Sequence, residues 1–172
     1  MKKLLLLTFS LLMMGFGEIL AQKAEWGVGV RFGEPTGINV RKYFGGGSNA
    51  LDITFGYNGY GYNEGRDYWK GEYRRSAVLM VNYLWMKPIS GADGLEIYFG
   101  LGGQIGSRRY WDRDIDREES TLSLGASGVI GVEYFIPSTP ISAFLDLGPY
   151  LELTPNPGWL WLDAGAGIRV NF

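Results

Sequence analysis

The strictest constraint on the fold is the alternation in the last stretch of the chain, residues 159–172, which reads WLWLDAGAGIRVNF. Apolar side chains occupy every second position from Leu160 to Phe172, and the positions between them hold mostly polar residues and glycine. Successive side chains of a β-strand point to opposite faces, so this pattern predicts a strand with one apolar and one polar face. A barrel wall immersed in lipid requires an apolar outer face along every strand. The preceding sequence should therefore repeat the pattern.

Earlier segments do repeat it, and turns rich in glycine, proline and asparagine separate them. The predicted strands are 25–32, 37–44, 51–58, 76–85, 95–108, 122–134, 141–153 and 159–172. The register of 76–85 stays open, because Val78, Met80 and Leu84 occupy its polar face. The 27 glycines, 11 tyrosines and 9 phenylalanines favour strands over helices. Residues 22–172 are thus predicted to be all-β, as an eight-stranded antiparallel up-and-down transmembrane β-barrel.

The first residues, 1–21, are organised like a secretory signal peptide. Lys2 and Lys3 precede the apolar run Leu4–Phe16, and the segment closes on Ala21. The run is shorter than the roughly 20 apolar residues that a membrane-spanning helix needs. We expect cleavage after Ala21 and export to the bacterial cell outer membrane.

The connections between the predicted strands sort by length. The second, fourth and sixth are short, whereas the first, third, fifth and seventh include the two long ones, 63–75 and 109–120. This parity puts short turns at one end and long loops at the other, as in bacterial outer-membrane barrels. The alternative is a soluble barrel of the lipocalin kind, which turns its apolar face inward. Eight strands enclose an interior only just wide enough for side chains, which suits the face rich in glycine and serine.

The predicted inner face carries acids and arginines, Glu152 and Arg108 among them, but almost no lysine. Its candidate ion-pair network consists of Glu25, Arg31, Arg41, Asp52, Glu96, Glu133, Asp146, Asp163 and Arg169. The fork-shaped guanidinium suits internal ion pairs better than an ammonium does. We expect pairing among Arg169, Glu25, Arg41 and Asp52, because barrel closure and a tight turn bring their strands together. Glu96 and Glu133 are expected to extend an acidic layer on the periplasmic side.

Aromatic side chains cluster around the long loops. They are Tyr57, Tyr60, Tyr62, Tyr68, Trp69, Tyr73, Tyr110 and Trp111. One interpretation is an aromatic girdle at the membrane interface. The other is a glycan- or protein-binding surface, for which Tyr68, Trp69, Tyr73, Tyr110 and Trp111 are the candidates. On this reasoning the loops contribute no side chains to a core, so their removal should leave folding intact.

On these residues the chain from Trp26 to Phe172 resembles the small eight-stranded outer-membrane β-barrel proteins, the group that includes OmpX and the membrane domain of OmpA. The most specific element is the terminal strand, where Phe172 preceded by Val170 and Ile168 looks like the signal that the barrel-assembly machinery recognises. The resemblance implies residence among outer-membrane lipids and assembly by that machinery. It implies no shared activity, because members range from structural tethers and adhesion factors to lipid A-modifying enzymes.

Several classes of chemistry lack a required residue. The chain has no His and no Cys. His-dependent acyl transfer or lipid A modification, His-ligated metals and thiolate metal sites therefore lack a required group. Asp112, Asp114 and Asp116 have the spacing of a calcium loop, but Arg117 stands where the turn glycine belongs. A net charge of −2 disfavours nucleic acid as a partner.

The sequence therefore predicts a monomeric, non-catalytic barrel that binds no cofactor, metal or nucleic acid. Its predicted role is structural, or an interaction of its loops with an unidentified extracellular or envelope partner. A narrow pore or a small-ligand carrier is the alternative, and a lipid-modifying enzyme ranks third.

Overall fold

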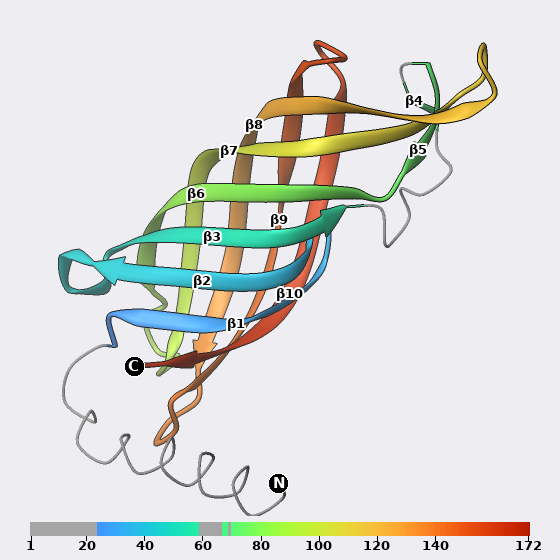
Figure 1. Ribbon diagram of the computed structural model, residues 1–172. Coiled ribbons are helices and arrows are strands. Elements are labelled where there is room, and N and C mark those ends of the chain that lie inside the picture. The colour runs from blue at the N-terminus through green and yellow to red at the C-terminus, as the bar shows by residue number, and fades with distance from the viewer. Residues whose placement is uncertain (1–23, 59–66, 69) are drawn as a thin grey trace, which may run out of the picture.

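The computed structural model describes residues 24–58, 67–68 and 70–172, and eight of its strands form a closed antiparallel barrel (Figure 1). These strands are β1 (Trp26–Gly33), β2 (Thr36–Phe44), β3 (Asn49–Asn58), β6 (Ser76–Pro88), β7 (Leu95–Asp112), β8 (Arg117–Phe135), β9 (Ile141–Thr154) and β10 (Leu160–Asn171). Two short strands, β4 (Asp67–Tyr68) and β5 (Gly71–Arg74), extend the sheet beside β7. The predicted all-β barrel is confirmed.

The last strand closes the barrel against the first. The register runs from Gly27 opposite Asn171 to Gly33 opposite Gly165. Closure leaves neither strand with an unpaired edge, which is the hazard of an open sheet. The alternating terminal stretch is thus a wall strand with a neighbour on both sides, β1 and β9.

The two ends of the barrel differ (Figure 1). The terminus end holds the start of β1, the end of β10 and short turns, one of which contains the 3-10 helix η1 (Gly45–Gly47). The hairpin end holds β4, β5 and the protruding β7–β8 hairpin. Much of the loop predicted at 109–120 is strand, because Arg109 pairs with Ser120 and Asp112 with Arg117. The loop predicted at 63–75 likewise contains β4 and β5.

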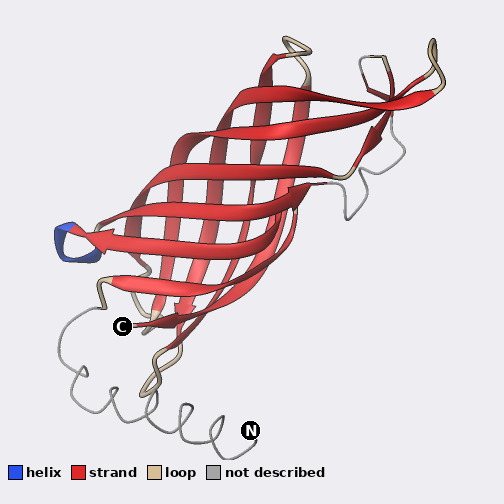
Figure 2. Cartoon of the chain, viewed as in Figure 1, coloured by secondary structure: helices blue, strands red, loops and turns tan. Residues whose placement is uncertain are grey.

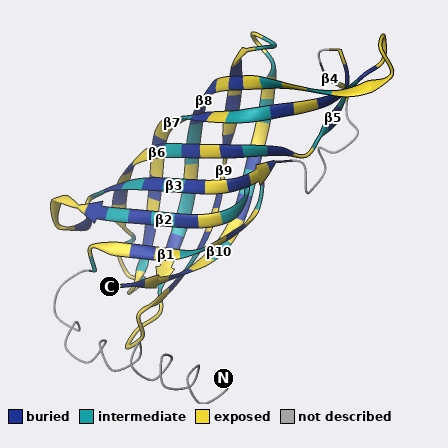
Figure 3. Cartoon of the chain, viewed as in Figure 1, coloured by how far each residue is buried: buried dark blue, intermediate teal, exposed yellow. Residues whose placement is uncertain are grey.

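The outer surface of the barrel is apolar and its interior is polar, with the two alternating along each strand (Figure 3). Leu101 and Leu160 are 65% and 67% exposed, whereas Arg41 and Arg169 are each 1% exposed. A lipocalin-like barrel would have the opposite arrangement, so that alternative is wrong. At the terminus end, outward aromatics contact one another, with ring centroids 5.1 Å apart for Tyr83 and Trp85. Such a belt is typical of a membrane–water interface.

Strand β6 departs from the alternation for a packing reason. Val78, Met80 and Leu84 do face inward and are buried. Leu84 and the next inward residue, Met86, belong to a small apolar cluster inside the terminus end. The cluster also contains Tyr43, Ala50 and Tyr98. The inner face of β6 is therefore apolar where its side chains pack on this cluster.

Strands dominate the described part of the chain (Figure 2). Within residues 24–58, 67–68 and 70–172, no helix is long and apolar enough to cross a membrane. The predicted signal peptide, residues 1–21, lies outside the described residues.

Candidate functional site

The inward side chains of β9 show which residues fill the lumen at each height. Its inward residues, from the terminus end to the hairpin end, are Ser142, Phe144, Asp146, Gly148, Tyr150 and Glu152. Apart from the glycine, each contacts a charged side chain from another strand. The lumen is therefore crossed by polar contacts at successive levels.

The first contact, toward the terminus end, is a cluster of two arginines and two acids, which we call the four-charge cluster. Arg41 Nε donates to Asp52 Oδ2 at 2.6 Å, and Arg41 Nη1 donates to Glu133 Oε2 at 2.7 Å. Arg169 completes the square, with Nη1 at 2.7 Å from Glu133 Oε1 and Nη2 at 3.1 Å from Asp52 Oδ2. The Arg169 guanidinium also lies 3.7 Å from the ring centroid of Phe144. The cluster carries no net charge, as burial requires.

Neutral side chains satisfy the remaining polar atoms of this cluster. Tyr43 Oη and Ser142 Oγ donate to Glu133 Oε1 at 2.9 and 2.7 Å. Asn39 Nδ2 donates to Asp52 Oδ1 at 2.8 Å, and Arg169 Nε donates to the Asn39 amide oxygen. A buried charge is tolerated when it is paired and its other donors or acceptors are satisfied.

A second contact lies further along β9. Arg31 Nη2 donates to Asp146 Oδ1 at 2.7 Å, and Tyr98 Oη donates to Asp146 Oδ2 at 3.0 Å. Glycines on neighbouring strands make room for both donors. A methyl group at Gly165 would lie 2.3 Å from Arg31 Cζ, and one at Gly131 would lie 2.5 Å from Tyr98 Cζ. These glycines therefore set where the inward side chains can lie.

The third contact lies toward the hairpin end and is centred on Arg108. Its Nε and Nη2 contact Glu152 Oε2 at 3.0 and 2.8 Å, and its Nη1 donates to Tyr73 Oη at 2.6 Å. Nη2 also donates to Tyr150 Oη at 3.4 Å. Tyr68 Oη donates to the other carboxylate oxygen of Glu152. The sequence prediction placed Arg108 and Glu152 inward but did not name this network.

Aromatic rings cover Arg108 at the hairpin end, and we call them the aromatic lid. Tyr68, Tyr73 and Tyr110 are 5%, 0% and 5% exposed, and Trp159 packs against them. The Tyr68 ring centroid lies 4.9 Å from that of Trp159 and 5.9 Å from that of Tyr73. Burial, and for Tyr68 also the hydrogen bond to a carboxylate, raises the pKa of Tyr68 and Tyr73.

The aromatic lid corrects the prediction of an exposed aromatic surface. Tyr73 and Tyr110 face the interior, since β5 and β7 run past the barrel rim and keep their alternation there. Tyr68 of β4 is buried against both of them. Trp111 faces outward and is half-buried, with Nε1 donating to Asp116 Oδ1 at 3.3 Å. Trp69 lies outside the described residues. The expectation that no core requires the loops is wrong for these tyrosines.

The predicted ion-pair network is present in part. Arg41, Asp52, Arg169 and Glu133 come together, and Arg31 pairs with Asp146. Glu133 lies between Arg41 and Arg169, so its charge is compensated by two arginines. Glu96 is buried in register with Glu133 on the neighbouring strand. Asp163 accepts a hydrogen bond from the Gln104 amide, which is neutral.

The pairing predicted for Glu25 is wrong. Its carboxylate is exposed and accepts from Lys42 Nζ, which lies 4.6 Å from the Trp26 ring centroid. The alternation stops holding here because Glu25 precedes the first residue of β1. The lumen beside that end is already filled, since a methyl group at Gly27 would lie 2.6 Å from the side-chain oxygen of Asn171.

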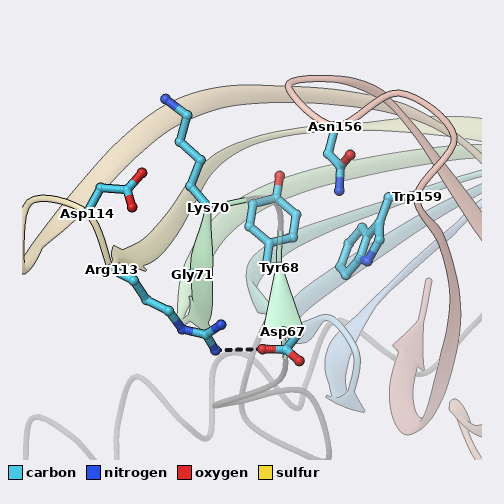
Figure 4. A pocket seen from close by; sticks show the side chains of 8 residues that line it. All are labelled: Asp67, Tyr68, Lys70, Gly71, Arg113, Asp114, Asn156 and Trp159. Carbon is cyan, nitrogen blue, oxygen red and sulfur yellow. Dashed lines mark hydrogen bonds and ion pairs between the residues drawn. The ribbon is translucent and has the colours of Figure 1, made fainter.

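Outside the lumen, the hairpin end carries an open hollow of about 560 Å³, which we call the outer hollow (Figure 4). Its side chains combine two acids, two bases, an amide and two aromatic rings: Asp67, Asp114, Lys70, Arg113, Asn156, Tyr68 and Trp159. Arg113 Nη2 donates to Asp67 Oδ1 at 2.6 Å across it, which raises the pKa of Arg113. Acids and bases in equal number give the hollow no net charge, and with the aromatic rings they can bind a polar ligand.

The described residues contain no group of three or more His, Cys, Asp or Glu side chains that could hold a metal ion. At the position of the suspected calcium loop, the Asp112 carboxylate accepts the backbone N–H of Asp114 at 2.9 Å. This contact is a local turn contact of the kind that aspartate makes.

The fold and the site together define a small, closed, eight-stranded β-barrel of the outer-membrane type, with a side-chain-filled lumen. No family model matches the chain, and no curated protein matches it by sequence. Among solved structures, the crystal structure of Neisserial surface protein A (NspA) is similar, with a TM-score of 0.54 and 10% sequence identity. The match covers 87% of this chain and 95% of that chain. At this identity the likeness concerns the fold alone.

Proposed function

We propose that the protein is a non-catalytic, monomeric outer-membrane barrel that works through the surface of its hairpin end. One observation carries this proposal. Ion pairs cross the lumen at three levels and the aromatic lid covers it, whereas the hairpin end offers an open hollow. The part of the molecule available to a ligand is therefore outside the barrel.

The outer surface supports residence in the outer membrane. Its apolar side chains suit contact with lipid, and the aromatics at the terminus end suit a headgroup layer. The termini of such barrels are periplasmic, which puts the hairpin end outside the cell. The expected signal peptide and the terminal Phe172 fit export followed by assembly through the barrel-assembly machinery.

The filled lumen also argues against the narrow pore, the alternative raised by the sequence. A pore would need a continuous water column, and an eight-stranded barrel has room for little besides its inward side chains. Opening the lumen would separate arginines from carboxylates at several levels, at a cost of several kcal/mol for each buried ion left without a partner.

A binding comparison on whole cells tests the interaction role. Cells that display the protein would be tested for adhesion to immobilised glycans and matrix proteins. The test variant combines Lys70→Glu with Asp114→Lys, both exposed at the outer hollow. The matched control combines Arg117→Glu with Glu119→Lys, an ion pair on the protruding β7–β8 hairpin that does not line the outer hollow.

Both variants keep the net charge, so a general electrostatic effect would be the same in each. We expect adhesion to be lost in the test variant and retained in the control. Equal adhesion by the parent and both variants would contradict a role for the outer hollow.

A further inference from the structure

The outward apolar surface of β7 and β8 ends at one level near the hairpin end. The outward row of β7 is apolar up to Ile105 and continues with Ser107 and Arg109. On β8 the partners of these two residues are Leu122, which is 64% exposed, and Ser120. An outward row that changes from apolar to polar marks the position of the headgroup layer. Arg109 is therefore at the depth of lipid headgroups.

Two more arginines gather at this level. Arg74, Arg75 and Arg109 line a hollow of about 340 Å³ together with Trp111 and Glu118, and we call it the arginine hollow. Arg74 and Arg109 are directly opposite each other in the β5–β7 ladder. Like charges at opposed positions destabilise a sheet. The arrangement therefore needs a compensating negative charge.

Among the described residues, one acid lies near Arg109 and another near Arg74. Arg109 Nη1 lies 3.6 Å from Glu118 Oε1, and Arg74 Nη2 lies 3.6 Å from Glu72 Oε2. All four side chains are more than a third exposed, and such pairs contribute little. The hollow itself is lined by three arginines and one glutamate. Its surplus of positive charge suits an anion with several acceptor oxygens.

The chemistry of the side chains points to a phosphate. The guanidinium fork matches phosphate oxygens through two parallel N–H donors, which an ammonium cannot provide. Trp111 lies beside the cations, with its ring centroid 5.9 Å from Arg74 Cζ. Tryptophan favours the interface between headgroups and acyl chains. The arginine hollow thus combines phosphate donors with an interfacial ring at one depth.

The terminus end provides an internal comparison. There the outward Lys42 is paired with the Glu25 carboxylate, so this cation already has its counter-charge. The arginines at the hairpin end face the other leaflet.

We propose that the arginine hollow binds a phosphate group of lipid A, the phosphorylated glycolipid of the outer leaflet. The proposal rests on the outer-membrane location and orientation given under the proposed function. It adds a lipid ligand held on the side of the barrel, apart from the outer hollow.

Lipid binding by the purified protein tests this inference. The folded protein in non-ionic detergent would be titrated with bis-phosphorylated lipid A, and bound lipid would be counted by native mass spectrometry. The test variant is R74Q/R75Q/R109Q, and the matched control is R113Q/R117Q at the exposed tip of the same hairpin. We expect the test variant to lower the affinity at least about ten-fold, because each charge-assisted hydrogen bond to phosphate is strong, and the control to bind like the parent.

The chemistry of the lipid gives a second readout. Lipid A without phosphates should bind the parent as weakly as intact lipid A binds the test variant. R74K/R75K/R109K should recover only part of the affinity, because lysine restores the charge but not the fork. If the triple glutamine variant does not fold, as judged by heat-modifiable migration, R109Q alone should still weaken binding several-fold.

Three results would overturn the inference: equal affinity of the parent and folded R74Q/R75Q/R109Q, equal affinity for lipid A with and without phosphates, or equal affinity for phosphatidylglycerol micelles. Any of them would leave the proposed function standing if the protein fractionates with the outer membrane and adheres through the outer hollow. Absence from that fraction would remove both proposals.

Discussion

Glu133 is the residue whose loss should damage the barrel most. Its carboxylate accepts four hydrogen bonds, two from arginines and two from the hydroxyls of Tyr43 and Ser142. The side chain is 0% exposed. Glu133→Gln keeps the shape but leaves Arg41 and Arg169 with only the Asp52 carboxylate, so a buried cation lacks a counter-charge.

The expected cost follows from that imbalance. Removing one partner of a buried ion pair destabilises by roughly 3–5 kcal/mol, because the remaining charge stays desolvated. Adding Arg169→Met to Glu133→Gln restores neutrality, since Arg41 Nε keeps its 2.6 Å contact with Asp52. The double variant should therefore lose less than the sum of the single losses, by about 0.5–3 kcal/mol.

Urea unfolding in lipid vesicles, followed by tryptophan fluorescence, measures these differences. The control cycle is Glu119→Gln with Arg117→Met, an exposed pair at the hairpin tip, where solvent screens the interaction. We expect little coupling there. Strictly additive losses at Glu133 and Arg169 would refute the account of the four-charge cluster.

Three further outcomes are expected. Gly131→Ala should lower stability by about 1–3 kcal/mol because the new methyl group displaces the Tyr98 ring, whereas Gly128→Ala, whose methyl group would meet Pro149 at an ordinary 3.4 Å, should be tolerated in the same unfolding assay. Burial and a carboxylate acceptor raise the pKa of Tyr68, so the folded state keeps the phenol proton above about pH 10, where an unfolded chain loses it. The contribution of this phenol to stability is therefore present below about pH 10 and declines above it. Tyr68→Phe should flatten that decline in a plot of Tm against pH. Deleting Phe172, or replacing it with Asp, should reduce the folded, heat-modifiable protein in the outer-membrane fraction, and equal amounts would contradict its role in assembly.

The alternation alone was enough to predict the wall and many of its inward residues. Every second residue of a strand points to the same face, so Arg41, Asp52 and Arg169 could be placed inside the barrel from the sequence. Glu133 could not be predicted as the partner of these arginines, because it is distant from them in the chain. Its height along the barrel axis depends on the register of every strand that lies between it and the arginines. Arg108 and Glu152 were correctly assigned to the inner face, but the sequence does not show that they lie at the same height along the barrel axis.

The errors arose where a strand begins or ends. Glu25 follows the parity of β1 but precedes its first residue, so nothing holds its side chain to the inner face. Tyr73 and Tyr110 were assigned to loops because charges and aromatics surround them, yet their strands continue beyond the rim. A signal was present in residues 108–112, since Arg108, Tyr110 and Asp112 keep the spacing of an inward row.

Single-channel recording in planar bilayers tests the central claim most directly. The refolded parent protein would be inserted into a phospholipid bilayer, with a large porin as the positive control for insertion. The ion pairs across the lumen and the aromatic lid lead us to expect no steady conductance at moderate voltage. Discrete, ohmic current steps from the parent, at a protein concentration where the porin control also inserts, would contradict a closed lumen.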